Sequence, residues 1–155
     1  MRRLILMRHA TAAPSLGEDL ARSLTAQGVR EAAAAGRALA ARGLNPDLVL
    51  VSPARRTQET WEAMADLFPS ARMETQLRLY DASADILMDA AEDEIDVGTV
   101  MLIAHNPGLH QLAYNLSTRA ARPAPRDFPP ATAAVFGFEA GRPRFPTLIL
   151  PGDTA

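Results

Sequence analysis

Three short apolar runs, each stopping abruptly at polar residues, constrain the fold of this chain most strongly. They are residues 3–7 (RLILM), 47–51 (DLVLV) and 99–104 (TVMLIA). A strand that is apolar at nearly every position, rather than at alternate ones, is typical of a sheet covered on both faces. Segments with helical patterns separate the runs. The sequence therefore predicts an α/β fold, a three-layer α/β/α sandwich with a mostly parallel central sheet.

Four helices are expected between and after these strands, over residues 26–42, 53–68, 84–94 and 107–118. Thr25, Ser52 and Ser83 are the candidate N-cap residues, because their side-chain oxygens can accept hydrogen bonds from the free N–H groups of a first helical turn. Gly43 is placed to end the first helix, since glycine adopts the left-handed backbone conformation that closes many helices.

The remaining segments predict the edges of the sheet. Residues 133–138 and 147–150 have the composition of two closing strands, and the prolines beside the second favour an edge position. Residues 72–80 fit a short extended segment that ends at Leu79-Tyr80. Residues 120–130 contain four prolines and are expected to form a loop.

Composition narrows the chemistry that the chain can perform. A length of 155 residues suits a single domain spanning residues 1–155. The chain has no cysteine, and all 16 basic residues are arginine. These absences exclude a thiolate nucleophile, a zinc site of the cysteine type, a Walker-type lysine and a lysine Schiff base. Any chemistry must use histidine, carboxylate, hydroxyl or arginine side chains.

The charge distribution favours an anionic ligand in the first third of the chain. The net charge is −2, which argues against a nucleic acid as the partner. Residues 1–56, however, carry nine arginines against four acidic residues. The apolar run near the start has four residues, fewer than a signal peptide or a membrane span needs. We therefore expect a cytoplasmic protein with no membrane partner.

Polar residues follow each of the three predicted strands at its carboxyl end. They are Arg8 and His9 after the first, Ser52, Arg55 and Arg56 after the second, and His105 and Asn106 after the third. Ligands of open α/β sheets bind beyond these ends, so the residues should meet in one pocket. Guanidinium groups bind phosphate oxygens in pairs, and a neutral imidazole can attack a phosphoryl group and hold it covalently. The sequence predicts a phosphate pocket that contains a nucleophile and needs no metal.

The order and spacing of these motifs resemble the histidine phosphatase superfamily. The matching segments, within residues 3–138, are Arg8-His9-Ala10, Leu24-Thr25-x-x-Gly28, Ser52-Pro53-x-x-Arg56-Thr57-x-x-Thr60 and His105-Asn106-Pro107-Gly108. Within this superfamily, the short chain and the HNPG sequence are similar to the SixA-type phosphohistidine phosphatases. The resemblance implies an α/β/α fold and a phosphatase that uses no cofactor.

The resemblance also implies a role for each matching residue. His9 corresponds to the nucleophile that becomes phosphohistidine, and Arg8 and Arg56 correspond to the two phosphate-binding arginines. His105 corresponds to the second histidine of the pocket. Asn106, which follows it, is expected among the substrate-binding residues.

The proton donor and the substrate are open at this stage. Asp81 stands where relatives often have an acidic residue that donates a proton, but it could instead cap the helix that follows it. A phosphohistidine on a protein is the favoured substrate. The alternatives are a small phosphate ester, or phosphate binding without turnover. The oligomeric state is also open, and the sequence is compatible with a monomer.

Overall fold

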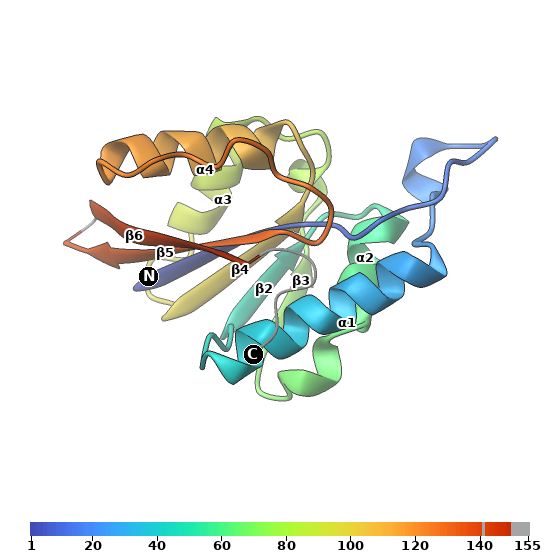
Figure 1. Ribbon diagram of the computed structural model, residues 1–155, viewed down its shortest axis with the longest axis horizontal. Coiled ribbons are helices and arrows are strands. Elements are labelled where there is room, and N and C mark those ends of the chain that lie inside the picture. The colour runs from blue at the N-terminus through green and yellow to red at the C-terminus, as the bar shows by residue number, and fades with distance from the viewer. Residues whose placement is uncertain (141, 150–155) are drawn as a thin grey trace.

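The computed structural model describes residues 1–140 and 142–149, in which one six-stranded sheet lies between two layers of helices (Figure 1). The strands are β1 (Arg3–Arg8), β2 (Leu48–Val51), β3 (Arg72–Thr75), β4 (Thr99–Ala104), β5 (Ala133–Glu139) and β6 (Arg142–Ile149). Their order across the sheet is β3-β2-β4-β1-β5-β6. Strands β3, β2, β4 and β1 pair in parallel. Strand β5 is antiparallel to β1, and β6 is antiparallel to β5. The predicted α/β architecture with a mostly parallel sheet is confirmed.

The helices cover both faces of this sheet. They are α1 (Ala26–Ala41), α2 (Arg55–Glu62), α3 (Ala84–Glu92) and α4 (Gly108–Arg119). In Figure 1, α3 and α4 cover one face, and α1 and α2 cover the other. No helix among the described residues is long and apolar enough to span a bilayer.

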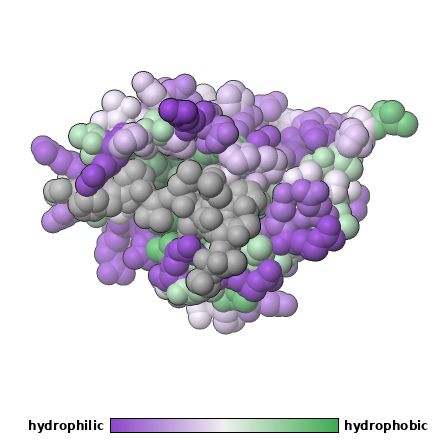
Figure 2. Space-filling model, viewed as in Figure 1, coloured by the Kyte–Doolittle hydropathy of each residue, from purple (hydrophilic) through white to green (hydrophobic). Residues whose placement is uncertain are grey.

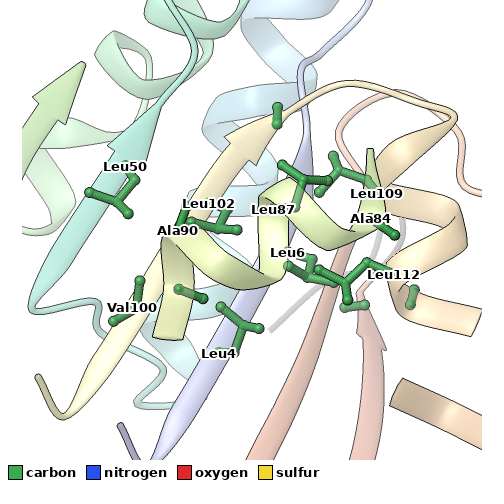
Figure 3. Close-up of a cluster of buried hydrophobic side chains, with 14 of the residues drawn as sticks. Leu4, Leu6, Leu50, Ala84, Leu87, Ala90, Val100, Leu102, Leu109 and Leu112 are labelled. Carbon is green, nitrogen blue, oxygen red and sulfur yellow. The ribbon is translucent and has the colours of Figure 1, made fainter. Parts of the chain in front are cut away.

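The strands are apolar at consecutive positions because alternate side chains enter two different cores. Leu4 and Leu6 of β1 belong to the cluster under α3 and α4, whereas Ile5 and Met7 belong to the cluster over α1 and α2. All four side chains are fully buried. Figure 3 shows Leu4 and Leu6 packed beneath α3 and α4, with Leu87 nearby. A strand with both faces covered needs this continuous apolar pattern.

Two of the three predicted N-caps are confirmed. The Thr25 hydroxyl accepts a hydrogen bond from the N–H of Gly28 at 2.9 Å, and Ser83 accepts one from Ile86 at 3.3 Å. Gly43 has a φ of 67°, the left-handed conformation expected of a helix stop.

The prediction for the second helix was wrong at both ends. Its N-cap is Ala54 rather than Ser52, whose hydroxyl bonds to His105 at 2.7 Å and accepts only the N–H of Ala54, at 3.4 Å, before the helix begins. The helix ends at Glu62 and not near residue 68. Beyond it the chain tightens into a 3₁₀ turn over Ala65–Leu67, η2. This turn folds Phe68 back so that its ring stacks on Trp61, with centroids 6.2 Å apart.

The edges of the sheet also differ in extent from the prediction. The extended segment expected over residues 72–80 is β3, which ends at Thr75, where its partner β2 ends at Val51. The chain then turns into a 3₁₀ segment over Leu77–Leu79, η3, and buries Leu79. The last strand, β6, lies at the edge as expected but begins already at Arg142, because it forms a hairpin with β5. Residue 150 of the predicted strand lies outside the described residues.

Candidate active site

The site is assembled where three neighbouring parallel strands end. Arg8 of β1 pairs with Ala104 of β4, so His9 and His105 follow side by side. Strand β2 lies on the other side of β4 and is followed by Ser52. The rings of His9 and His105 are 5.5 Å apart, and 7% and 6% of the two residues' surface is exposed. The predicted meeting of these sequence-distant residues is confirmed.

The hydrogen bond of His9 fixes which ring nitrogen is free to react. Its Nδ1 lies 2.7 Å from the carbonyl oxygen of Ala10. A carbonyl only accepts, so Nδ1 carries the hydrogen and the lone pair is on Nε2. Burial lowers the pKa of His9 to about 4, and the charges of Arg56, Arg8 and Arg22 act in the same direction, whereas the bond to Ala10 opposes them. At neutral pH, His9 presents an unprotonated nitrogen.

We expect the imidazole of His9 to titrate near pH 4 in the free protein, well below the usual value of about 6.5. Protonating this ring places a charge in a buried position beside arginines, so the ring stays neutral until the pH falls to that range. Nuclear magnetic resonance titration of the histidine resonances measures the midpoint, with His9→Ala used to assign the signal. A midpoint at 6 or above would contradict the buried, cationic environment.

His105 is held between a hydroxyl and a guanidinium group. Nε2 lies 2.7 Å from the Ser52 hydroxyl, and Nδ1 lies 3.3 Å from a terminal nitrogen of Arg56. Arg56 can only donate, so Nδ1 accepts and Nε2–H donates to Ser52. Burial, followed by the charge of Arg56, lowers the pKa of His105 to about 3. Ser52 therefore orients a neutral imidazole.

Two arginines next to these histidines have donors without partners. The Arg56 side chain is 6% exposed, and one terminal nitrogen of Arg8 donates to the carbonyl of Phe128 at 3.1 Å. The Nε atoms of both arginines are buried and have no hydrogen-bond partner in the structure. Burial, and then repulsion from Arg56, lowers the pKa of Arg8. Because buried donors are rarely left unpaired, these atoms point to an anion as the missing partner.

Arg55 does not contribute to this arrangement. It is exposed on the first turn of α2, where its Nε lies 3.5 Å from a carboxylate oxygen of Glu59. The neighbouring Arg56 is buried and contacts His105. Of the two arginines expected in the pocket after this strand, the structure therefore brings Arg56 to His105 and leaves Arg55 outside the site.

Asp81 and Asn106 lie at a pocket of about 360 Å³ beside His105. Ser83 caps α3, so the alternative role of Asp81 as the helix cap was wrong. The amide nitrogen of Asn106 donates to the Phe128 carbonyl at 2.8 Å, while its Oδ1 is buried without a partner. A substrate contact by Asn106 stays a prediction, as does the proton-donor role of Asp81.

Sequence reasoning missed three residues from the loop before α1 and the turn before α3. Asp19 lies in a 3₁₀ turn over Asp19–Ala21, η1, and accepts a hydrogen bond from Arg56 at 3.0 Å and one from the Tyr80 hydroxyl at 2.5 Å. Arg22 lies 3.3 Å from the same carboxylate. No periodic pattern marks these positions, because an irregular loop and a turn carry them. The surplus of arginine in the first third of the chain was the available signal.

None of the described residues form a cluster of three or more histidine, aspartate or glutamate side chains suited to a metal ion. The chemistry that the arrangement itself supports is transfer of an anionic group. It supplies an unprotonated imidazole nitrogen next to two guanidinium groups, in a site where His9, His105 and Arg56 are buried.

Comparisons with known proteins agree with this geometry. The family model for the histidine phosphatase superfamily, branch 1, matches residues 4–100. A candidate phosphohistidine phosphatase SixA from Agrobacterium tumefaciens has a similar structure, with a TM-score of 0.87 and 28% identity over 97% of this chain and 98% of that one. Another, from Nakamurella multipartitia, has a TM-score of 0.83 and 29% identity over 98% of this chain and 97% of that one.

A curated plant relative extends the comparison. An uncharacterized chloroplastic protein of Arabidopsis thaliana is 33% identical over 135 residues, which cover 75% of this chain. The match spans 59% of the length of that relative.

Proposed function

The chain belongs to the histidine phosphatase superfamily, and from this premise we propose that it is a metal-independent phosphatase that forms a phosphohistidine on His9. One observation carries the proposal. The free Nε2 of a neutral His9 lies in the same buried site as two arginines whose Nε donors have no partner. A phosphoryl group bound there would satisfy the donors and be presented to the nucleophile.

The reaction follows in two displacements. The lone pair of His9 Nε2 attacks phosphorus, a nitrogen–phosphorus bond forms, and the bond to the leaving group breaks with its electron pair. Arg8 and Arg56 stabilise the negative charge spread over the phosphoryl oxygens during transfer. Water then attacks the same phosphorus, the nitrogen–phosphorus bond breaks with its electron pair returning to Nε2, and inorganic phosphate and the neutral imidazole are released.

A phosphohistidine carried by another protein is the substrate that we favour. Two of the similar structures are named as candidate phosphohistidine phosphatases, at 28% and 29% identity, and this supports the substrate class as a proposal. The alternative is a small phosphorylated metabolite, because the pocket of about 360 Å³ beside His105 has room for the rest of such a molecule. The expected cytoplasmic location stays a prediction from the sequence.

A panel of substrates tests this choice. Initial rates are compared for a protein phosphorylated on histidine, for p-nitrophenyl phosphate and for common sugar phosphates. We expect the highest kcat/KM on the phosphohistidine protein. A preference for one small ester over the phosphoprotein would favour the alternative, and no turnover of any substrate would favour a binding module.

Asp81→Asn should separate ester substrates from phosphohistidine. An alkoxide leaving group needs a proton, whereas a protonated imidazole leaves readily, so loss of a general acid would lower ester hydrolysis by roughly 10²-fold and spare phosphohistidine. Rates on both substrates measure the split, with Asp85→Asn on the exposed face of α3 as the matched control. Equal losses on the two substrates would contradict a proton-donor role.

Prolonged chelation should leave the rate unchanged. Arginine supplies the positive charge that many phosphatases obtain from bound metal ions. The measurement is the initial rate before and after dialysis against a strong chelator. Activity that is lost and then restored by added magnesium or zinc would contradict the proposed mechanism.

A further inference from the structure

The guanidinium group of Arg56 is hydrogen-bonded to Asp19 in the structure. Its two terminal nitrogens donate to the backbone oxygen of Asp19 at 2.8 Å and to Oδ2 of the same residue at 3.0 Å. The Tyr80 hydroxyl donates to Oδ2 at 2.5 Å, and Arg22 donates to Oδ1 at 3.3 Å. Donors from three side chains therefore fix this carboxylate beside an arginine that the proposed function assigns to phosphate.

The loop that carries Asp19 projects from the body of the molecule next to the site. Figure 1 shows this segment extending beyond α1 and α2, and Figure 2 shows a hydrophobic tip on the projection. Leu16, within the loop, is fully exposed. The Asp19 side chain is 47% exposed, whereas that of Arg56 is 6% exposed. Asp19 thus contacts a buried site residue from an exposed loop, whereas Arg8 comes from the end of β1 and Arg56 from α2.

Among the described residues, three arginines and one carboxylate determine the net charge near His9. Arg8, Arg22 and Arg56 each disfavour protonation of His9, so all three act on the site. His9 and His105 are neutral at pH 7. Asp19 is the carboxylate that is hydrogen-bonded to two of these arginines, and its charge acts on His105 in the opposite direction. Three positive charges are thereby reduced to two at the place where a phosphate dianion would bind.

We propose that Asp19 sets the charge of this site: its carboxylate weakens the binding of phosphate dianions and so speeds release of the inorganic phosphate product. The inference deepens the proposed function, because it requires the site to bind a phosphoryl group. A fixed negative charge opposes the dianion before and after the reaction alike. Removing that charge would strengthen ground-state binding without a matching gain in the transition state, which lowers KM and retains product.

Positioning of Arg56 does not depend on the Asp19 carboxylate alone. The guanidinium group is also held by the Asp19 backbone oxygen and by Nδ1 of His105. Asparagine has the same shape as aspartate and keeps an oxygen that accepts a hydrogen bond. Asp19→Asn therefore removes the charge and keeps one acceptor oxygen for Arg56 and Tyr80, losing only the 3.3 Å contact to Arg22, whereas Asp19→Ala removes the charge and both acceptors.

Calorimetric titration of the full chain with inorganic phosphate tests the inference. We expect Asp19→Asn to lower the Kd for phosphate by about tenfold, since a unit charge close to a bound anion in a partly exposed site is worth this order. The inhibition constant of phosphate should fall in parallel. Glu18→Gln is the matched control, because it removes the same charge one residue away on the exposed face of the loop. We expect its Kd to stay within about twofold of the wild-type value, owing to screening by solvent.

Two further results decide the outcome. Tyr80→Phe removes the hydroxyl that holds Asp19 but keeps the charge, so its effect on Kd should be smaller than that of Asp19→Asn. An Asp19→Asn protein that binds phosphate with unchanged or lower affinity would overturn the inference alone, and a weakened Asp19→Ala beside it would assign Asp19 to positioning Arg56. A wild-type protein that binds no phosphate would overturn the proposed function as well.

Discussion

Replacing His9 by alanine should lower kcat by roughly 10⁶-fold, the scale seen when a covalent nucleophile is removed. The variant keeps both arginines, so it should still bind inorganic phosphate, and the missing step is formation of the nitrogen–phosphorus bond. Stopped-time assays on a phosphohistidine protein give the rate. Phosphate binding by the same variant shows that the pocket remains.

His110→Ala is a useful companion to that variant. His110 lies on α4 with its Nε2 2.9 Å from the carbonyl of Pro125, and its ring stacks on Phe128. It has no contact with the site histidines among the interactions that the structure describes. We expect a modest loss of activity and of stability from His110→Ala. A His9→Ala protein that retained more than about a hundredth of the wild-type rate would contradict the nucleophile assignment.

Replacing Arg56 by lysine should lower kcat/KM by roughly 10³-fold, even though the charge is kept. A lysine ammonium is a point charge and cannot reproduce the planar group that contacts both Asp19 and His105 and, in the proposed mechanism, the phosphoryl oxygens. Arg55→Lys is the matched control one residue away, on the exposed face of α2. Steady-state rates of the two variants give the comparison.

An essential Arg55 and a dispensable Arg56 would contradict the helix register. The structure predicts the opposite result, because Arg56 is buried against Asp19 and His105 while Arg55 is exposed. A loss from Arg56→Lys that appeared in KM alone, with kcat unchanged, would assign Arg56 to uniform binding and not to the transition state.

The strands and the positions of the main site residues could be predicted because one physical requirement determines both. A parallel sheet covered on both faces needs strands that are apolar throughout, and such strands end visibly at the first polar residue. Strand β1 ends at Arg8 and is followed by His9, and β4 ends at Ala104 and is followed by His105. Because parallel strands end at the same edge, strand ends read from the sequence also located the site.

The contacts that depend on irregular backbone could not be predicted in the same way. Ser52 has the residue type and position of an N-cap, yet its hydroxyl bonds to His105, a partner 53 residues away. Asp19 and Tyr80 meet across 61 residues of sequence. Local propensity contains no information on such long-range pairs, so the net charge of the site became clear only from the three-dimensional arrangement.

The glycine of the HNPG sequence illustrates the same limit. A Cβ atom on Gly108 would lie 2.1 Å from the carbonyl oxygen of Ala82, so α4 can approach the turn before α3 only with glycine at this position. The sequence motif marked Gly108, but not the segment that it faces. This close approach places the residues around Asp81 at the pocket beside His105.

Locating the phosphoryl group on the protein during turnover tests the central claim most directly. Wild-type protein is mixed with a phosphorylated substrate, quenched in base to preserve a phosphoramidate, and mapped by mass spectrometry and phosphorus magnetic resonance. Because Nδ1 of His9 is occupied by the Ala10 carbonyl, we expect phosphate on Nε2 of His9, labile in acid and absent from His9→Ala. Phosphate on any other residue, or label that persists in His9→Ala, would contradict it.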